Sequence, residues 1–175
     1  MIEMKNHLFL LEVLKEILKI QSNAKLLLVG DGPNKEKIQK KAEELEIQEN
    51  IIYYGVTDKV NEVLQAMDVF VLPSLYEGVP LTVIEAAASG LKYVVSDTIN
   101  SHLDKNKLEL KLSLQLTAKE WAEKIINHAK NYSRQDQKEL ISNSGFDIKK
   151  QALLLEKIYK EISCEENKNE KRAEF

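Results

Sequence analysis

The sequence contains a single cysteine, Cys164, among its 175 residues. One cysteine cannot form an intramolecular disulfide or a cysteine-rich metal site, so we expect a reducing, cytoplasmic environment. No run approaches the roughly 18 consecutive apolar residues of a membrane-spanning helix. The first residues show no secretory signal pattern. The 25 lysines and arginines are interspersed with 28 aspartates and glutamates, which indicates no basic surface for nucleic acid.

Two common phosphate-binding motifs are absent as well. The sequence has no Gly-Lys-Ser/Thr, which the phosphate loop of nucleoside triphosphatases requires. Gly30-Asp31-Gly32 starts like a dinucleotide loop, but position 35 is a lysine where the third glycine of G-x-G-x-x-G would stand. A nucleotide-dependent dehydrogenase is therefore disfavoured.

The three histidines indicate no metal site. His102 and His128 have no carboxylate or cysteine at metal-ligand spacing, and we expect both to face solvent. His7 stands at a predicted helix start, where it either caps the helix or approaches a ligand. We therefore expect no bound metal.

Short apolar runs alternate with amphipathic helical segments over the first hundred residues. An apolar run without alternation is typical of a strand that is covered on both faces, as in a parallel sheet. The order of strand, turn and helix implies right-handed crossovers. We predict an α/β fold with a doubly wound, Rossmann-like parallel sheet. The predicted strands cover 25–29, 50–55, 68–72 and 93–96, and the predicted helices cover 8–20, about 58–66 and 80–88.

The remaining third of the chain has a different pattern. Leucines alternate with polar residues from Leu108 to Leu116, which predicts a half-exposed edge strand. Thr117 followed by Glu120 forms a capping-box pattern ahead of a helix that carries Trp121.

A final helix is predicted from about Asp147 to Ile162. Its predicted inner face consists of Ala152, Leu155 and Ile158. We expect a single domain over residues 1–164, followed by a charged, frayed tail over residues 165–175.

The segment from Pro73 to Ala86 carries the chemistry. It is a loop that follows a predicted strand and leads into a helix, at the sheet edge where α/β folds bind ligands. Free amides at Gly78, at Val79 and in the first helical turn, together with the helix dipole, favour a diphosphate. Gly78 has no side chain to block the close approach of a ligand.

Two glutamates flank the start of this helix. Glu77 lies in the loop and Glu85 lies eight residues further on, inside the helix. They are candidates to accept charge-assisted hydrogen bonds from sugar hydroxyls at two points of an extended ligand. From spacing alone, two glutamates in this arrangement are more often ordinary surface residues at a helix start.

The run from Glu77 to Gly90 resembles the E-x7-E signature of the retaining glycosyltransferases of family 4, which have the GT-B fold. Four further segments agree with that family in order and spacing: Lys5-Asn6-His7, Leu28 to Pro33, Tyr54-Gly55-Val56 and Ala66 to Ser74. The match extends from Lys5 to Thr98. It is strongest to bacterial capsular and exopolysaccharide transferases, and it implies the C-terminal, donor-binding half of a GT-B enzyme.

The resemblance implies a role for each matched residue. Lys5 and Glu77 are the implied catalytic residues: Glu77 holds hydroxyls of the donor sugar, while Lys5 and nearby amides stabilise the leaving diphosphate. Glu85 is implied to bind the ribose. The implied donor-binding residues are Gly30, Tyr54, Gly55, Val56, Gly78, Val79, Pro80, Leu81 and Glu85. The resemblance implies no metal, in keeping with the absence of an Asp-x-Asp motif, and no cofactor beyond a UDP- or GDP-linked sugar as donor substrate.

The chain departs from the family in what precedes Lys5. An arginine that the family has six residues before this lysine, and the whole N-terminal acceptor-binding domain, have no counterpart. We therefore expect the isolated chain to be an incomplete enzyme that is inactive alone. An isolated domain, a truncated gene and one half of a split enzyme are all compatible with this sequence.

The expected partners are a nucleotide sugar and the acceptor domain, in cis or in trans. Peripheral membrane association through the complete enzyme and self-association of this chain are further expectations. The alternative function is a non-catalytic module of the same fold that binds nucleotide or another protein. The sequence leaves the sugar, the base, the acceptor and the linkage position open.

Overall fold

The computed structural model describes residues 1–100, 103 and 107–173, in two compact units, Met1–Gln137 and Lys138–Phe175. The first unit contains η1 (Glu3–Lys5), α1 (His7–Ile20), β1 (Leu26–Val29), α2 (Lys35–Glu44), η2 (Gln48–Asn50), β2 (Ile51–Gly55), α3 (Val60–Gln65), β3 (Phe70–Leu72), α4 (Leu81–Ala88), β4 (Tyr93–Ser96), β5 (Glu109–Leu112) and α5 (Ala118–Ala129). The second unit contains α6 (Lys138–Asn143) and α7 (Ile148–Ala173). The single domain predicted over residues 1–164 and the frayed tail predicted over residues 165–175 stay predictions.

The strand pairs are all parallel, which confirms the predicted α/β class. β1 pairs with β2, and β4 lies between β3 and β5. The hydrogen bonds divide these strands into a two-stranded and a three-stranded sheet rather than one continuous sheet. Val71 of β3 packs against the apolar clusters beneath both sheets, so side-chain packing joins them where the hydrogen-bond ladder is interrupted.

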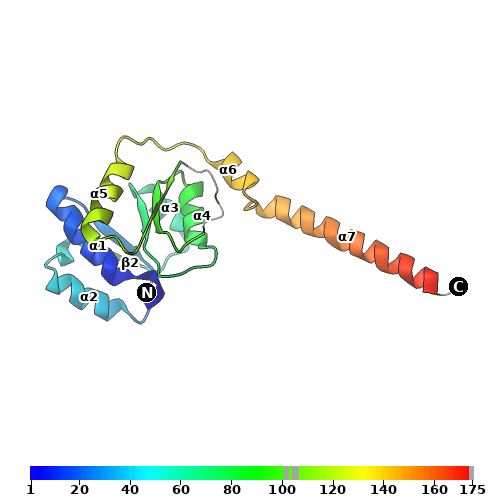
Figure 1. Ribbon diagram of the computed structural model, residues 1–175, viewed down its shortest axis with the longest axis horizontal. Coiled ribbons are helices and arrows are strands. Elements are labelled where there is room, and N and C mark those ends of the chain that lie inside the picture. Colours follow the sequence, from blue (N-terminus) through cyan, green and yellow to red (C-terminus); the bar gives the residue numbers. More distant parts are fainter. Residues whose placement is uncertain (101–102, 104–106, 174–175) are drawn as a thin grey trace. The chain divides into compact units, whose positions relative to one another are not determined.

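Helices cover both faces of these sheets. On one side, α1 lies beside α5 and also contacts α2 (Figure 1). There, Leu11 and Leu14 of α1 join Leu28 and Ile38 in one buried cluster. A further cluster joins α3 and α4. All four residues of β4 are buried, as predicted for a strand covered on both faces.

A strand forms within the segment predicted as one, but β5 covers only Glu109–Leu112 of the predicted range from Leu108 to Leu116. β5 pairs only with β4, which makes it an edge strand among the described strands. The Thr117 hydroxyl accepts a hydrogen bond from the Glu120 amide, and the Glu120 carboxylate accepts one from the Thr117 amide. This capping box satisfies free amides at the start of α5 and fixes where the helix begins.

Gly90 ends the turn after α4 in a left-handed conformation, with φ of 65°. A Cβ atom at this position would lie 2.5 Å from the carbonyl oxygen of Gln135. We expect Gly90→Ala to lower the free energy of unfolding by about 1–3 kcal/mol, because both the backbone and this contact would be strained. Urea denaturation measures the effect. Gly78→Ala is the matched control, because a Cβ there meets nothing within 4 Å, and equal midpoints for the two variants would contradict this prediction.

The predicted inner face of the final helix is not buried. Leu155 and Ile158 of α7 are 52% and 42% exposed. The periodicity identified an amphipathic helix correctly, but it could not identify what covers the apolar face. The other described helix of this unit, α6, has only six residues.

Candidate functional site

A charged contact joins the start of the chain to the loop that follows β3. The Lys5 ammonium donates a hydrogen bond to Glu77 Oε1 at 2.5 Å, across 72 positions of sequence. The Glu77 side chain is only 10% exposed and the Lys5 side chain is 28% exposed. Asn6, in a left-handed conformation, turns the chain between η1 and α1 directly after Lys5. The two residues with implied catalytic roles are therefore held together.

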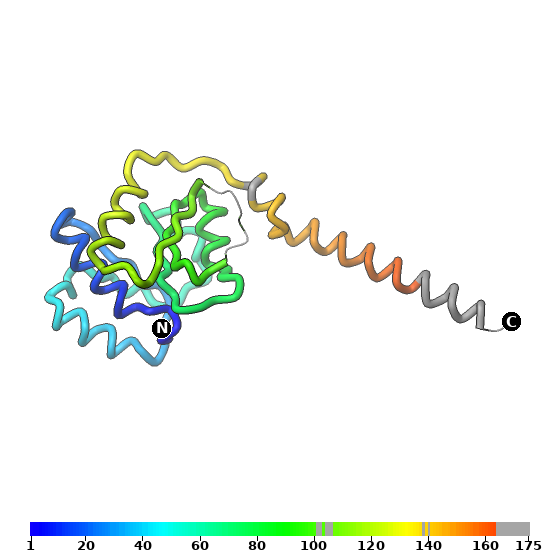
Figure 2. The backbone as a smooth tube through the Cα atoms, viewed as in Figure 1, coloured from blue at the N-terminus to red at the C-terminus, as the bar shows by residue number. Residues whose placement is uncertain are grey.

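The loop from β3 to α4 is fixed against the N-terminal segment. It starts beside that segment (Figure 2), where the Leu75 amide donates a hydrogen bond to the Met4 carbonyl at 2.9 Å. One residue earlier, the buried Ser74 hydroxyl donates to Glu77 Oε1 at 3.1 Å. The sequence motif includes Ser74, but nothing in its spacing indicated this contact.

The start of α4 presents unpaired amide groups. Pro80 is the N-cap residue in an extended conformation, and no side chain of the described residues caps the helix. No described residue accepts a hydrogen bond from the amides of Gly78, Val79 or Leu81. Gly78, Val79 and Leu81 are all exposed. These donors and the positive end of the α4 dipole can therefore bind an anion.

The remaining predicted site residues lie on α4 and at the carboxyl ends of β1 and β2. Glu85 is exposed on α4, and its carboxylate forms no hydrogen bond or ion pair with a described residue. The Gly30 amide donates to the Gly55 carbonyl at 2.7 Å, so the carboxyl ends of β1 and β2 lie together. Tyr54 and Val56 are 51% and 80% exposed. Within the part of the chain described, no hydrogen bond connects these residues to Glu77.

His7 is the first residue of α1, and it is partly buried beside Lys5. The preceding Asn6 is the N-cap residue, so the alternative in which His7 caps the helix is wrong, while the alternative of a ligand contact stays a prediction. Its Nδ1 atom is buried without a hydrogen-bond partner among the described residues. Burial, followed by the positive charges of the amino terminus and Lys5, lowers the pKa of His7 below its ordinary value of 6.5.

This lowered pKa makes the stability depend on pH. Because the unfolded chain binds the proton more readily, the contribution of His7 to the free energy of unfolding decreases as the pH falls below about 6.5. We expect His7→Gln to lose less stability than the wild type when urea denaturation is repeated at about pH 5 instead of pH 7. An equal loss in both proteins would contradict the assignment. Some pH dependence should remain in the variant, because burial also lowers the pKa of His128.

The prediction that His128 faces solvent is wrong. The ring is partly buried, and Nε2 lies 2.9 Å from the carbonyl oxygen of Leu108. The helical position of His128 could not show that the segment before β5 packs beside the end of α5. His102 lies outside the described residues.

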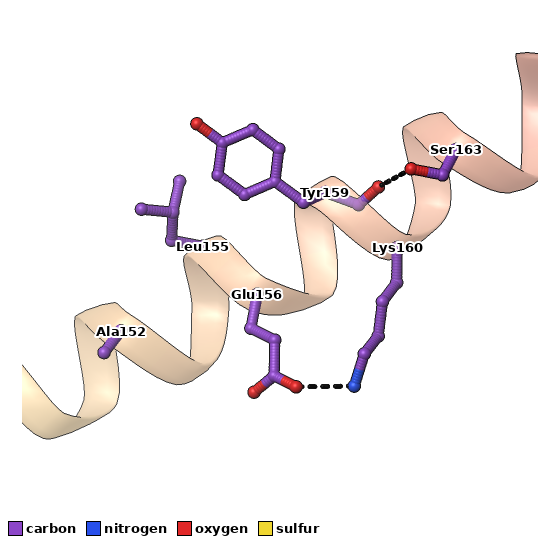
Figure 3. A pocket seen from close by; sticks show the side chains of 6 residues that line it. All are labelled: Ala152, Leu155, Glu156, Tyr159, Lys160 and Ser163. Atoms are coloured by element: carbon purple, nitrogen blue, oxygen red, sulfur yellow. Dashed lines mark hydrogen bonds and ion pairs between the residues drawn. The ribbon is translucent and has the colours of Figure 1, made fainter.

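A separate surface hollow lies on α7 and contains none of the predicted site residues. Figure 3 shows its side chains, with an ion pair between Glu156 and Lys160 at 2.6 Å and a hydrogen bond from the Ser163 hydroxyl to the Tyr159 carbonyl at 3.0 Å. Its six lining residues all belong to this one helix, so it is the surface of a helix rather than an enclosed binding cavity.

Within the described part of the chain, no helix has the length and apolar character needed to cross a membrane.

The fold is that of glycosyltransferases with a GT-B architecture. A profile of the family described as "Glycosyl transferases group 1" matches residues 1–131. The chain belongs to this family.

Two curated relatives are informative. The chain is 34% identical over 170 residues to "Putative glycosyltransferase EpsF" of Bacillus subtilis, covering 95% of this chain and 44% of the relative. It is 32% identical to the "UDP-Gal:alpha-D-GlcNAc-diphosphoundecaprenol alpha-1,3-galactosyltransferase" of Escherichia coli, covering 60% of this chain and 28% of the relative. The chain thus spans less than half the length of these relatives.

Solved structures show the same fold. A crystal structure of TarM from S. aureus, in a complex that includes UDP, has a TM-score of 0.69 at 27% identity, covering 75% of this chain and 27% of that one. The crystallised C-terminal domain of a glycosyl transferase group 1 protein from Francisella tularensis has a TM-score of 0.63 at 18% identity. This second match covers 82% of this chain and 80% of that one, so the fold corresponds to that C-terminal domain.

Proposed function

We propose that this chain is the donor-binding part of a retaining glycosyltransferase that uses a nucleotide-diphosphate sugar in cell-surface polysaccharide synthesis. The observation that carries the proposal is the contact between Lys5 and Glu77 at 2.5 Å, beside the unpaired amides that precede α4. It places a cation, a carboxylate and a helix N-terminus next to one another. These groups complement a sugar diphosphate, because its phosphates pair with the cation and the helix N-terminus while its hydroxyls donate to the carboxylate.

Each group has a role in this proposal. The amides of Gly78 and Val79 and the ammonium of Lys5 bind the diphosphate and stabilise the negative charge that develops on it as the glycosidic bond breaks. Glu77 accepts hydrogen bonds from the sugar. Glu85, which lies within α4, accepts hydrogen bonds from the ribose. The base lies at the carboxyl ends of β1 and β2. No protein nucleophile and no metal takes part.

The comparisons support a nucleotide-sugar donor, but they do not show which base this chain binds. The structure of TarM was solved with UDP, and the relative from E. coli is named for UDP-galactose. We therefore propose a UDP-linked sugar in preference to a GDP-linked one. Because the chain covers less than half of its relatives, we propose that transfer also requires an acceptor-binding half, which the complete enzyme supplies in cis or in trans.

Calorimetric titration of the purified chain with UDP, GDP and their common sugar conjugates tests this function. We expect saturable binding of UDP and its conjugates, weaker binding of GDP, and no sugar transfer by the chain alone. Absence of binding by a folded sample would contradict the proposal and would favour the non-catalytic module. Transfer to acceptor by the isolated chain would contradict the proposed need for a second half.

A further inference from the structure

The two oxygens of the Glu77 carboxylate have different environments. Oε1 accepts hydrogen bonds from both Lys5, at 2.5 Å, and the Ser74 hydroxyl, at 3.1 Å. No described residue donates a hydrogen bond to Oε2. A carboxylate can accept several hydrogen bonds, so Oε2 retains its full capacity for a ligand.

Ser74 is itself anchored from the neighbouring strand. Its carbonyl oxygen accepts hydrogen bonds from the Ser96 hydroxyl at 2.5 Å and from the Thr98 hydroxyl at 3.1 Å. These two hydroxyl oxygens lie 2.8 Å apart. Ser74 and Ser96 are both completely buried, and Ser96 is the last residue of β4. The backbone of Ser74 is therefore held beside the end of β4, although the residue belongs to a loop, and its hydroxyl projects from this fixed position to Glu77.

We propose that Ser74 is a positioning residue that fixes the Glu77 carboxylate through Oε1 and thereby presents Oε2 to a hydroxyl group of the donor sugar. This inference rests on the proposed function and adds a residue to its site. Lys5 alone cannot hold the carboxylate once a diphosphate binds, because the diphosphate attracts the same ammonium. The Ser74 hydroxyl carries no charge, so it remains committed to Glu77 in both states.

A purely structural role for Ser74 makes different predictions. If the hydroxyl only stabilised the loop, its removal would weaken the binding of UDP and of UDP-sugars by the same factor. The effect would also persist when Glu77 is absent. A positioning role affects only ligands that carry a sugar, and it acts only through Glu77.

The test is a double-mutant cycle on the whole chain, with Ser74→Ala, Glu77→Ala and the double variant. Calorimetric titration compares UDP with UDP-galactose, UDP-glucose and UDP-N-acetylglucosamine. We expect Ser74→Ala to weaken binding of the preferred UDP-sugar about 10-fold, because binding must then order a carboxylate that the hydroxyl no longer fixes, and to leave UDP binding within about twofold. The double variant should bind this UDP-sugar as Glu77→Ala does.

Each other result would overturn the inference in a recognisable way. Equal weakening of UDP and UDP-sugar by Ser74→Ala, or an additive loss in the double variant, would show a structural role. An unchanged UDP-sugar affinity in Glu77→Ala would show that Glu77 does not contact the sugar, while nucleotide binding would stand. If the folded wild type bound no nucleotide, the proposed function would fail and this inference with it.

A second variant covers the case in which Ser74→Ala does not fold. Ser96→Ala removes one of the two hydroxyl donors to the Ser74 carbonyl and leaves the Ser74 side chain in place. We expect a smaller loss in the same direction, about threefold for the UDP-sugar and none for UDP. Equal losses for both ligands, or no loss for either, would count against the proposed anchoring of Ser74.

Discussion

Replacing Glu85 with alanine is expected to weaken the binding of UDP about 10- to 100-fold, as for the loss of one or two hydrogen bonds to a charged group. Glu85 is exposed on α4, and its carboxylate has no partner among the described residues, so its removal should leave the folded chain intact. The loss should be the same for UDP and UDP-sugars, because the proposed contact is with the ribose that both contain. Calorimetric titration measures both.

The control for this variant is Glu36→Ala, which removes an exposed glutamate from a different helix, α2. A ligand series locates the contact more sharply. The wild type should bind 2′-deoxy-UDP more weakly than UDP, and Glu85→Ala should bind the two equally. If Glu85→Ala kept the wild-type affinity for UDP, the assignment of this residue to the ribose would be wrong.

Trp121→Ala should have the largest effect on stability. Trp121 is completely buried between α1, α5 and the three-stranded sheet. Its ring meets that of Phe9 edge to face, with the centroids 5.5 Å apart, and its indole nitrogen donates a hydrogen bond to the Ser113 carbonyl at 2.9 Å. Truncating a buried tryptophan in this way lowers the free energy of unfolding by about 3–5 kcal/mol.

Urea denaturation with a tryptophan-independent signal, such as far-ultraviolet circular dichroism, measures this loss. Trp121→Phe should cost less, because it keeps an aromatic ring against Phe9 while it loses the hydrogen bond to Ser113. Lys119→Ala, on the exposed side of the same helix, is the control for helix propensity. A cost below about 1 kcal/mol for Trp121→Ala would contradict the packing described here.

The fold was predictable where one local signal determined one local outcome. The continuous apolar run at Tyr93–Ser96 predicted a strand covered on both faces, and all four of its residues are buried. The capping box at Thr117 predicted the start of α5. Apolar periodicity carries no information on hydrogen bonding between elements, so the division into a two-stranded and a three-stranded sheet was not predictable. Periodicity also does not show what covers an apolar helix face, so the exposure of Leu155 on α7 was not predictable.

The site was predictable mainly through resemblance. Spacing alone left Glu77 and Glu85 as either ligand contacts or ordinary surface residues. The structure shows that Glu77 contacts Lys5, whereas it assigns Glu85 no partner among the described residues. Ser74 could not be assigned a role from sequence, because the hydroxyl groups that anchor its carbonyl belong to residues 22 and 24 positions further along the chain.

The proposal depends most on a diphosphate binding at the free amides of Gly78, Val79 and Leu81, at the start of α4. Amide chemical shifts of the 15N-labelled chain, recorded with UDP and with uridine, test this location most directly. We predict that UDP shifts the amides of Gly78, Val79 and Leu81, that uridine leaves them unchanged, and that neither ligand shifts Gly145 in the second unit. UDP binding that left these three amides unchanged, or equal shifts with uridine, would contradict the account.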